Sequence, residues 1–389
     1  MREVFESNYL VDNTCIAGIF ENEDFGKYGD YWLFSFKAIP MLNDLRSRSL
    51  PFTTPWLNQT HLDYMQLPKL SYTNKSLSDI IDQRAIELHE IACRDNKEVW
   101  IMWSGGIDST TLLSAFIKNI PENELKHRYS IVMSANTIAE NFYFYQKFVH
   151  NKFDCINWLE LDLTEELLQN TIVLHGDPAN ALLSIPTVAA FQNLIPDRKH
   201  LLPFRENIGT LIDGVNSFVG INKNVPAGWT EWYVNKLASS IPQSEQAQSI
   251  AAFWWWHYVN FKWHGSMLRP FYFTRKTVDK AITPEEFRYY YDTCFYINED
   301  FQNWSYSNIE RMAEDPFNYK PLMRDYIFDV DQNQLYRQYK KFKGSRRTNL
   351  NTAYGDSNIP LVYDKNWVGH SQSPKLKNTI RELLNEFQG

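Results

Sequence analysis

A short stretch around residue 105 combines glycines, hydroxyls and a carboxylate. Its members are Ser104, Gly105, Gly106, Asp108, Ser109 and Thr110. Adjacent glycines let the backbone turn without a Cβ and bring amide N–H groups close to an anion, and the hydroxyls add hydrogen-bond donors. A carboxylate suits such a place when Mg²⁺ lies between it and phosphates. The stretch therefore predicts a phosphate-bearing ligand, with Asp108 as a ligand of Mg²⁺.

The segments around this stretch predict a parallel sheet. Residues 99–103 form a hydrophobic run that favours a buried strand, and residues 109–118 favour a helix. Further strands are expected at 128–135, 156–161 and 171–176, with a helix at 139–149 and an amphipathic helix from residue 76 onward. Strands that alternate with helices are typical of an α/β fold in which helices cover both faces of a parallel sheet. Ligands bind at the carboxyl ends of such strands, where the next helix adds its positive end, so the glycine turn is expected to hold phosphates.

Residues 104–109, SGGIDS, resemble the SGGxDS signature of the PP-loop ATP pyrophosphatases, and all six positions match. These enzymes split ATP between the α- and β-phosphates while they transfer AMP to a substrate. The spacing is neither the GxxxxGK[ST] nor the GxGxxG pattern of other nucleotide loops. The resemblance implies an adenine nucleotide alpha hydrolase-like fold that binds ATP and Mg²⁺, with Ser134 and Gly176 added to the nucleotide-binding residues.

The order of helix, strand and glycine turn in residues 76–112 resembles the start of the synthetase domain of asparagine synthetases. That family carries a second signature farther along the chain, roughly SGxGADE. Here residues 175–180, HGDPAN, match it at Gly176 and Asp177, and Asn180 stands where the family has an acid. The resemblance implies that Asp177 is a catalytic residue and a second contact for Mg²⁺ or pyrophosphate.

Two later segments also resemble the synthetase domain. Residues 267–282 are similar to its R-x-PF-x-D segment, and residues 318–328 are similar to the start of a helix that carries a lysine. On this comparison Lys320 is the catalytic cation, because an ammonium there would stabilise charge that grows in the transition state. The alternative interpretation is a solvated surface lysine.

The resemblance implies an AMP-forming amide ligase that acts on a small-molecule carboxylate or base acceptor and a nitrogen donor. Glutamine-using members expose a cysteine after removal of Met, whereas this chain has Arg2, and residues 1–75 are too few for a glutaminase domain. The expected nitrogen source is ammonia, an amine or an ammonia-supplying partner. Two alternatives stay open. One is a nucleic-acid or nucleobase modification enzyme that uses the same adenylation, and the other is a non-catalytic nucleotide-binding subunit.

Composition limits the partners and the compartment. The chain of 389 residues carries a formal charge of -7, which gives no general attraction for nucleic acid or anionic membranes, so nucleic acid is the less favoured partner. No apolar run approaches the roughly 18 residues of a membrane span, so a cytoplasmic protein without membrane contact is expected. The four cysteines form no CxxC pair, so their local spacing predicts neither a zinc ribbon nor a dithiol redox motif.

The expected organisation has three parts. Residues 1–75 form an accessory region with some strand, residues 76–200 form the nucleotide-binding α/β domain, and residues 201–389 form a mainly helical lobe that shapes the substrate site.

Three features keep a structural and a functional interpretation. His175 either donates a hydrogen bond to a phosphate or is a structural group. A cluster of tryptophans either lines a substrate pocket or belongs to the core. The members of that cluster are Trp254, Trp255, Trp256 and Trp263. The basic run 337–349 is a solvated face, a flap over triphosphate or a nucleic-acid contact.

Overall fold

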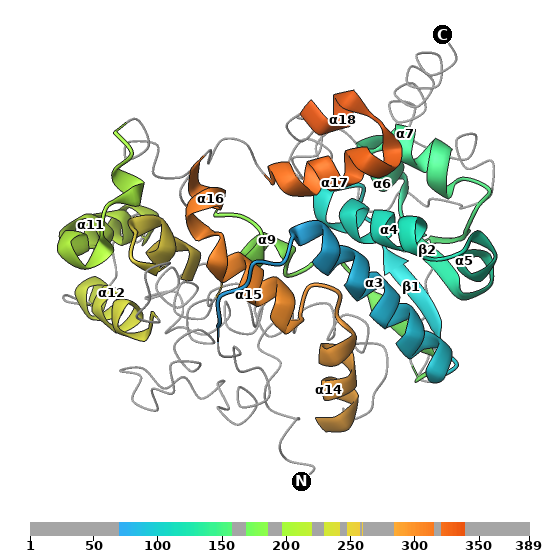
Figure 1. The fold of residues 1–389 in the computed structure, drawn as a ribbon, viewed down its shortest axis with the longest axis horizontal. Helices are drawn as coiled ribbons and strands as arrows, with labels where there is room; N and C mark the ends of the chain where they lie inside the picture. Colours follow the sequence, from blue (N-terminus) through green and yellow to red (C-terminus); the bar gives the residue numbers. More distant parts are fainter. Residues whose placement is uncertain are drawn as a thin grey trace, which may run out of the picture. The chain divides into compact units, whose positions relative to one another are not determined.

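The computed structural model describes residues 70–157, 169–185, 197–219, 229–241, 247–256, 259, 284–314 and 320–338 (Figure 1). The expectations for the accessory region before residue 70, for residues 267–282, for Trp263 and for most of the basic run lie outside these residues.

A four-stranded parallel sheet confirms the predicted α/β class. Its strands are β1 (Glu98–Met102), β2 (Tyr129–Met133), β3 (Asp154–Asn157) and β4 (Thr171–Leu174), in the order β3-β2-β1-β4. Ile101 of β1 pairs with Ile131 of β2 on one side and with Leu174 of β4 on the other. All three side chains are buried, as expected for a parallel strand that is covered on both faces.

The helices near the sheet include those predicted from residue 76 onward and at 109–118, and short helices at 122–128 and 135–140 that were not predicted. They are α3 (Leu77–Arg94), α4 (Ile107–Asn119), α5 (Glu122–Arg128), α6 (Ala135–Glu140) and α7 (Phe142–Phe144), followed by a π-helical turn (Tyr145–Val149). Ser76 caps α3, because its side chain accepts a hydrogen bond from the Asp79 N–H. The helix expected at 139–149 is divided at Asn141, whose side chain caps α7 by accepting from the Phe144 N–H at 3.3 Å. Asparagine competes for backbone groups in this way, which explains the break.

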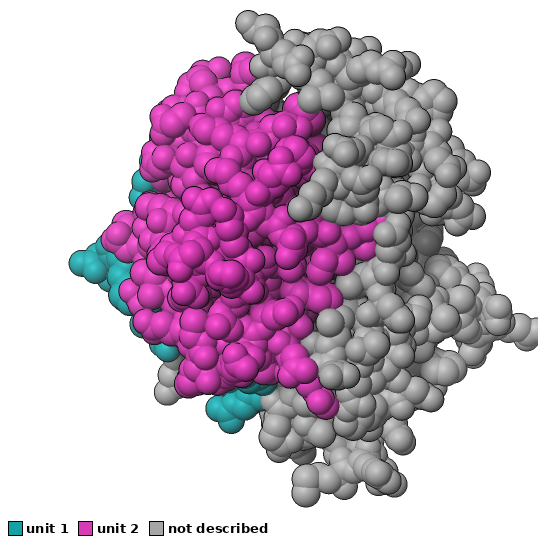
Figure 2. All heavy atoms as spheres, turned by 90° about the vertical axis from the view of Figure 1, so that its right-hand side faces the viewer, with its two compact units in different colours: residues 1–75, 177–292, 296–319 teal, residues 76–176, 293–295, 320–389 magenta. Residues whose placement is uncertain are grey.

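The chain divides into two compact units (Figure 2). One unit contains the sheet and comprises residues 76–176, 293–295 and 320–389. Within it α4 packs against α3 and against α17 (Pro321–Asp331), which is followed by α18 (Gln334–Gln338). The buried guanidinium of Arg84 in α3 donates to the main-chain oxygens of Cys294 at 2.7 Å and Phe295 at 3.2 Å, which attaches this short segment to the sheet unit.

The other unit is helical where it is described, in agreement with the predicted helical C-terminal region. Its helices include α9 (Ala179–Leu182), α11 (Ile208–Val219), α12 (Trp229–Ser240), α15 (Glu299–Ser307) and α16 (Ile309–Glu314), and α14 (Pro284–Thr293) lies mostly within it. Trp254, Trp255 and Trp256 are buried, and Trp255 Nε1 donates to Ser305 Oγ at 2.7 Å. These three tryptophans therefore belong to the core. The three-part division of the chain at residues 75 and 200 stays a prediction.

Among the residues that the structure describes, no helix is both long and apolar enough to cross a membrane.

A buried carboxyl ends α17. Asp331 is fully buried, and its Oδ1 accepts a hydrogen bond from the Asn333 N–H at 2.8 Å. Its Oδ2 is also buried and has no hydrogen-bond partner within the described ranges. Burial raises the pKa of this carboxyl to about 6, although Lys147 nearby acts in the opposite direction. The negative charge of Asp331 at neutral pH is therefore unfavourable in the folded state.

We expect Asp331→Asn to raise the free energy of unfolding by about 2 kcal/mol near pH 7 and to change it little near pH 4. The folded pKa lies above the unfolded one, so the folded chain binds more protons between these values and its stability falls as the pH rises through this window. Urea denaturation at both pH values measures the effect. Asp329→Asn, at an exposed position of the same helix, is the control and should show no such difference. An effect of Asp331→Asn that is equal at both pH values would contradict the raised pKa.

Candidate functional site

The predicted phosphate-binding residues gather at the carboxyl edge of the sheet. Ser104, Gly105 and Gly106 lie between β1 and α4, Ser134 follows β2 directly, and Gly176 follows β4. The chain leaves β1 for β2 and β3 on one side and returns to β4 on the other, so β1 stands where the strand order reverses. Such a switch point is where open parallel sheets bind their ligands.

Gly105 is required by the shape of the turn. Its φ is +73°, and a Cβ at this position would lie 2.6 Å from the Thr137 carbonyl oxygen of α6. On its other side, the hydroxyl of Tyr336 in α18 donates to the Gly105 carbonyl oxygen at 3.2 Å. Burial raises the pKa of the Tyr336 hydroxyl, so this group stays protonated and available as a donor. Gly105 therefore contacts both α6 and α18, and its lack of a side chain allows the close approach of α6.

The hydroxyls of the turn form a small network. The Ser104 N–H donates to Ser109 Oγ at 3.0 Å, and the two serine oxygens lie 2.9 Å apart. The Ser109 hydroxyl also donates to the Gly106 carbonyl oxygen at 3.2 Å. Ser104 is exposed, so its hydroxyl can turn to a ligand, whereas Ser109 is buried and braces the turn. The network keeps the loop in shape before any ligand binds.

Thr110 points toward the core. It is fully buried, and its Oγ1 accepts a hydrogen bond from Trp103 Nε1 at 3.0 Å. This contact connects the last residue before the turn to the first turn of α4.

Gly176 brings the end of β4 against the start of α4. A Cβ at Gly176 would lie 3.0 Å from Asp108 Cβ and 3.0 Å from the Ser109 backbone nitrogen. A Cβ at this position would require the start of α4 to shift by a few tenths of an ångström. Asp177 is the next residue in the chain and belongs to the helical unit, so its part in the site stays a prediction.

Lys320 meets Asp108 within the sheet unit. The Lys320 Nζ contacts Asp108 Oδ1, although the two residues are 212 positions apart in the sequence. The lysine side chain is 0% exposed and that of Asp108 is 19% exposed, so the interpretation of Lys320 as a solvated surface group is wrong. Lys320 is the N-cap of α17 and has a φ of 55°, an uncommon conformation for a residue with a side chain.

The charges of this pair suit a nucleotide with a metal ion. Asp108 offers hard carboxylate oxygens of the kind that Mg²⁺ prefers, and it lies in the first turn of α4 beside the glycine turn. The Lys320 ammonium compensates the carboxylate when no metal is present and carries positive charge into the same place. Backbone amides, a carboxylate and an ammonium together fit phosphates and Mg²⁺.

His175 follows the structural interpretation. It is buried, and its Nε2 lies 3.8 Å from the Sγ of the buried Cys294. The sequence did not predict the hydrogen bond of Tyr336 to Gly105. No local pattern around Tyr336 distinguishes it from the many other tyrosines, so only the packing of α18 reveals this role.

Comparisons with protein-family models, with curated proteins and with solved structures found no match for this chain. What its structure establishes is an α/β fold with a four-stranded parallel sheet and a helical C-terminal region.

Proposed function

We propose that this chain is an ATP-dependent adenylating enzyme of the PP-loop type, which transfers AMP to an acceptor and releases pyrophosphate. The contact of Lys320 with Asp108 supports the proposal most. The SGGxDS stretch and the lysine-bearing segment each resemble the same family, although they lie far apart in the sequence. Two charged groups that the resemblance assigns to phosphate chemistry thus occur beside one glycine turn.

Each residue has a task in this proposal. The amides of Gly105 and Gly106 and the hydroxyl of Ser104 bind phosphate oxygens, assisted by the positive end of α4. Asp108 holds Mg²⁺, which neutralises phosphate charge when it is bound. Lys320 stabilises the negative charge that grows as pyrophosphate leaves, and its burial strengthens this effect because little water screens it.

The proposed reaction is amide formation in two steps, as in asparagine synthetases. An oxygen of the acceptor carboxylate attacks the α-phosphorus of ATP, and the bond between that phosphorus and the pyrophosphate oxygen breaks. A nitrogen nucleophile then attacks the acyl carbon and displaces AMP. The nitrogen is proposed to come from ammonia, an amine or an ammonia-supplying partner, with ATP and Mg²⁺ as the other requirements.

The test is pyrophosphate release from ATP and Mg²⁺ by the full chain, in the presence of separate pools of amino acids and other carboxylates, each with ammonium. At least one carboxylate pool should stimulate release, and omission of Mg²⁺ should abolish it. A parallel arm with RNA and DNA at two salt concentrations identifies nucleic-acid modification, because phosphate contacts make such binding strongly salt-dependent.

Stimulation of pyrophosphate release by nucleic acid alone would contradict the amide ligase and support a nucleic-acid modification enzyme. ATP binding without release under any condition would support a non-catalytic nucleotide-binding subunit and contradict the proposed chemistry.

A further inference from the structure

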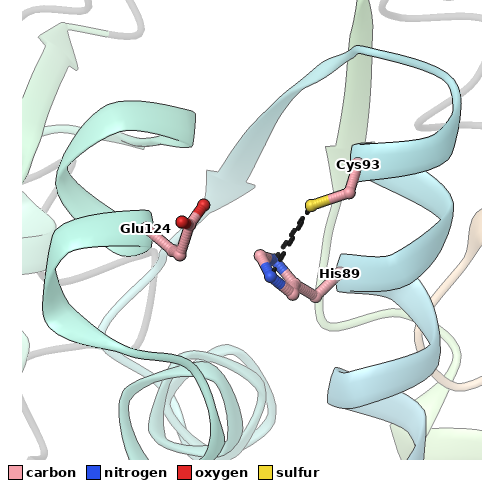
Figure 3. A group of neighbouring side chains, drawn as sticks. All are labelled: His89, Cys93 and Glu124. Carbon is pink, nitrogen blue, oxygen red and sulfur yellow. Dashed lines mark hydrogen bonds between the residues drawn. The ribbon is translucent and has the colours of Figure 1, made fainter.

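A second group of chemically active side chains lies in the sheet unit, away from the glycine turn. It consists of His89 and Cys93 of α3 and Glu124 of α5 (Figure 3). His89 and Cys93 are one helical turn apart, and Figure 3 shows that both point toward the helix that carries Glu124. Their nitrogen, sulfur and oxygen atoms all lie within 4.8 Å of one another.

The spacing of these atoms fits a zinc ion. Cys93 Sγ lies 3.6 Å from His89 Nε2. A tetrahedral Zn²⁺ with sulfur at about 2.3 Å and nitrogen at about 2.0–2.1 Å holds its sulfur and nitrogen ligands about 3.6 Å apart. Two of the three ligand atoms therefore already have the required separation. The ligand oxygen of Glu124 lies within 4.8 Å of the ligand atoms of His89 and Cys93.

Tyr129 orients the imidazole of His89. The Tyr129 hydroxyl lies 2.9 Å from His89 Nδ1, and the two rings are stacked with their centroids 6.0 Å apart. When Nδ1–H donates to this hydroxyl, Nε2 carries the lone pair and is the ring nitrogen available to a metal ion. Histidines that bind metals are held in the same way by a hydrogen bond at the other ring nitrogen.

We propose that His89, Cys93 and Glu124 bind a divalent cation that accepts thiolate and imidazole ligands, with Zn²⁺ as the favoured ion. A thiolate and an imidazole select such ions over Mg²⁺ and Ca²⁺, which prefer oxygen ligands. Three protein ligands leave the fourth tetrahedral position to water.

The place of the cluster in the fold separates it from the glycine turn. α3 ends at Arg94, just before β1 begins, and α5 ends at Arg128, directly before β2. The cluster therefore lies toward the amino ends of the strands, opposite the glycine turn. An ion here connects α3 to α5 and is expected to stabilise the sheet unit without taking part in phosphate chemistry. The proposal does not depend on the proposed function.

Co²⁺ titration of the metal-free full chain tests the proposal, under a reductant that is not itself a thiol. A thiolate bound to Co²⁺ gives a charge-transfer band in the near ultraviolet, so a band that saturates at a single equivalent is expected. Zn²⁺ should remove it, because Zn²⁺ binds such sites more tightly than Co²⁺. Cys93→Ser should abolish the band, and His89→Gln and Glu124→Gln should each weaken Co²⁺ binding at least about 10-fold.

Cys155→Ser is the matched control, because Cys155 is another cysteine of the same unit, on β3, and forms no disulfide. It should leave the band unchanged. Cys93 is exposed, so serine there should not disturb the core. A second readout is the midpoint of thermal unfolding, which Zn²⁺ should raise by several degrees in the wild type and not in Cys93→Ser. A missing band in the wild type, a band that persists in Cys93→Ser, or unchanged Co²⁺ affinity in both His89→Gln and Glu124→Gln would overturn the site.

Discussion

Replacing Asp108 with asparagine is expected to lower Mg²⁺-dependent pyrophosphate release by about 100-fold or more. The substitution keeps the size of the side chain but removes the negative charge that would hold Mg²⁺. It also removes the partner of the buried Lys320 ammonium. The packing of Gly176 against Asp108 Cβ is preserved. Thermal unfolding should be measured on the same preparations, because loss of the carboxylate next to the buried Lys320 ammonium can lower stability. Steady-state rates at several Mg²⁺ concentrations measure the effect.

Asp79→Asn is the matched control for this experiment. Asp79 also lies in the first turn of a helix, α3, but it is exposed and outside the glycine turn. Its replacement should leave pyrophosphate release unchanged. If Asp108→Asn retained the wild-type rate and Mg²⁺ dependence, Asp108 would have no role as a metal ligand.

Replacing Lys320 with methionine is expected to lower pyrophosphate release by about 100-fold while the affinity for ATP changes far less. Methionine fills much of the buried space but carries no charge, so the loss falls on charge stabilised in the transition state. Rates at saturating ATP and direct ATP binding, measured on the same preparations, separate the two effects. The thermal unfolding of the same preparations should also be measured, because an Asp108 charge beside a buried methionine can affect stability.

Lys118→Met is the control for Lys320→Met. Lys118 also pairs with a carboxylate of the sheet unit, Asp82 at 2.6 Å, but it is partly exposed and lies in the last turn of α4. Its loss should not change turnover. A double variant of Lys320 and Asp108 should be much less impaired than the product of the single effects, because the two groups act on the same phosphates. Strictly multiplicative effects would show that they act independently.

Local sequence patterns were enough to predict the sheet and the turn. Apolar runs of strand length alternate with helical periodicity, and this depends only on neighbouring residues, so β1, β2, β4, α3 and α4 appear close to their expected positions. The turn at Gly105 was also predicted, because adjacent glycines are a local signal of a turn. The close approach of Thr137 of α6, which leaves no room for a Cβ at Gly105, is a tertiary contact that the sequence did not show. The helix expected at 139–149 was less well predicted, since the capping hydrogen bond of Asn141 outweighs the apolar periodicity around it.

Only the tertiary structure decided which distant groups meet. No spacing in the sequence shows that Lys320 is buried against Asp108. Nor does it show that Tyr336 donates a hydrogen bond to the Gly105 carbonyl oxygen. The same is true of the hydrogen bond from Trp103 to the Thr110 hydroxyl oxygen. The first two contacts depend on how α17 packs on α4 and how α18 packs on α17. Such packing is set by many individually weak contacts between distant parts of the chain.

In the group of His89, Cys93 and Glu124, the sequence determines one part of the site and the tertiary structure determines the other. The spacing of His89 and Cys93 by four residues in a predicted helix already places both on one face. A pattern of closely spaced cysteine pairs does not include this pair of a histidine and a cysteine. Glu124 and Tyr129 join them only because α5 and β2 fold back beside α3, a long-range arrangement that helical periodicity does not encode.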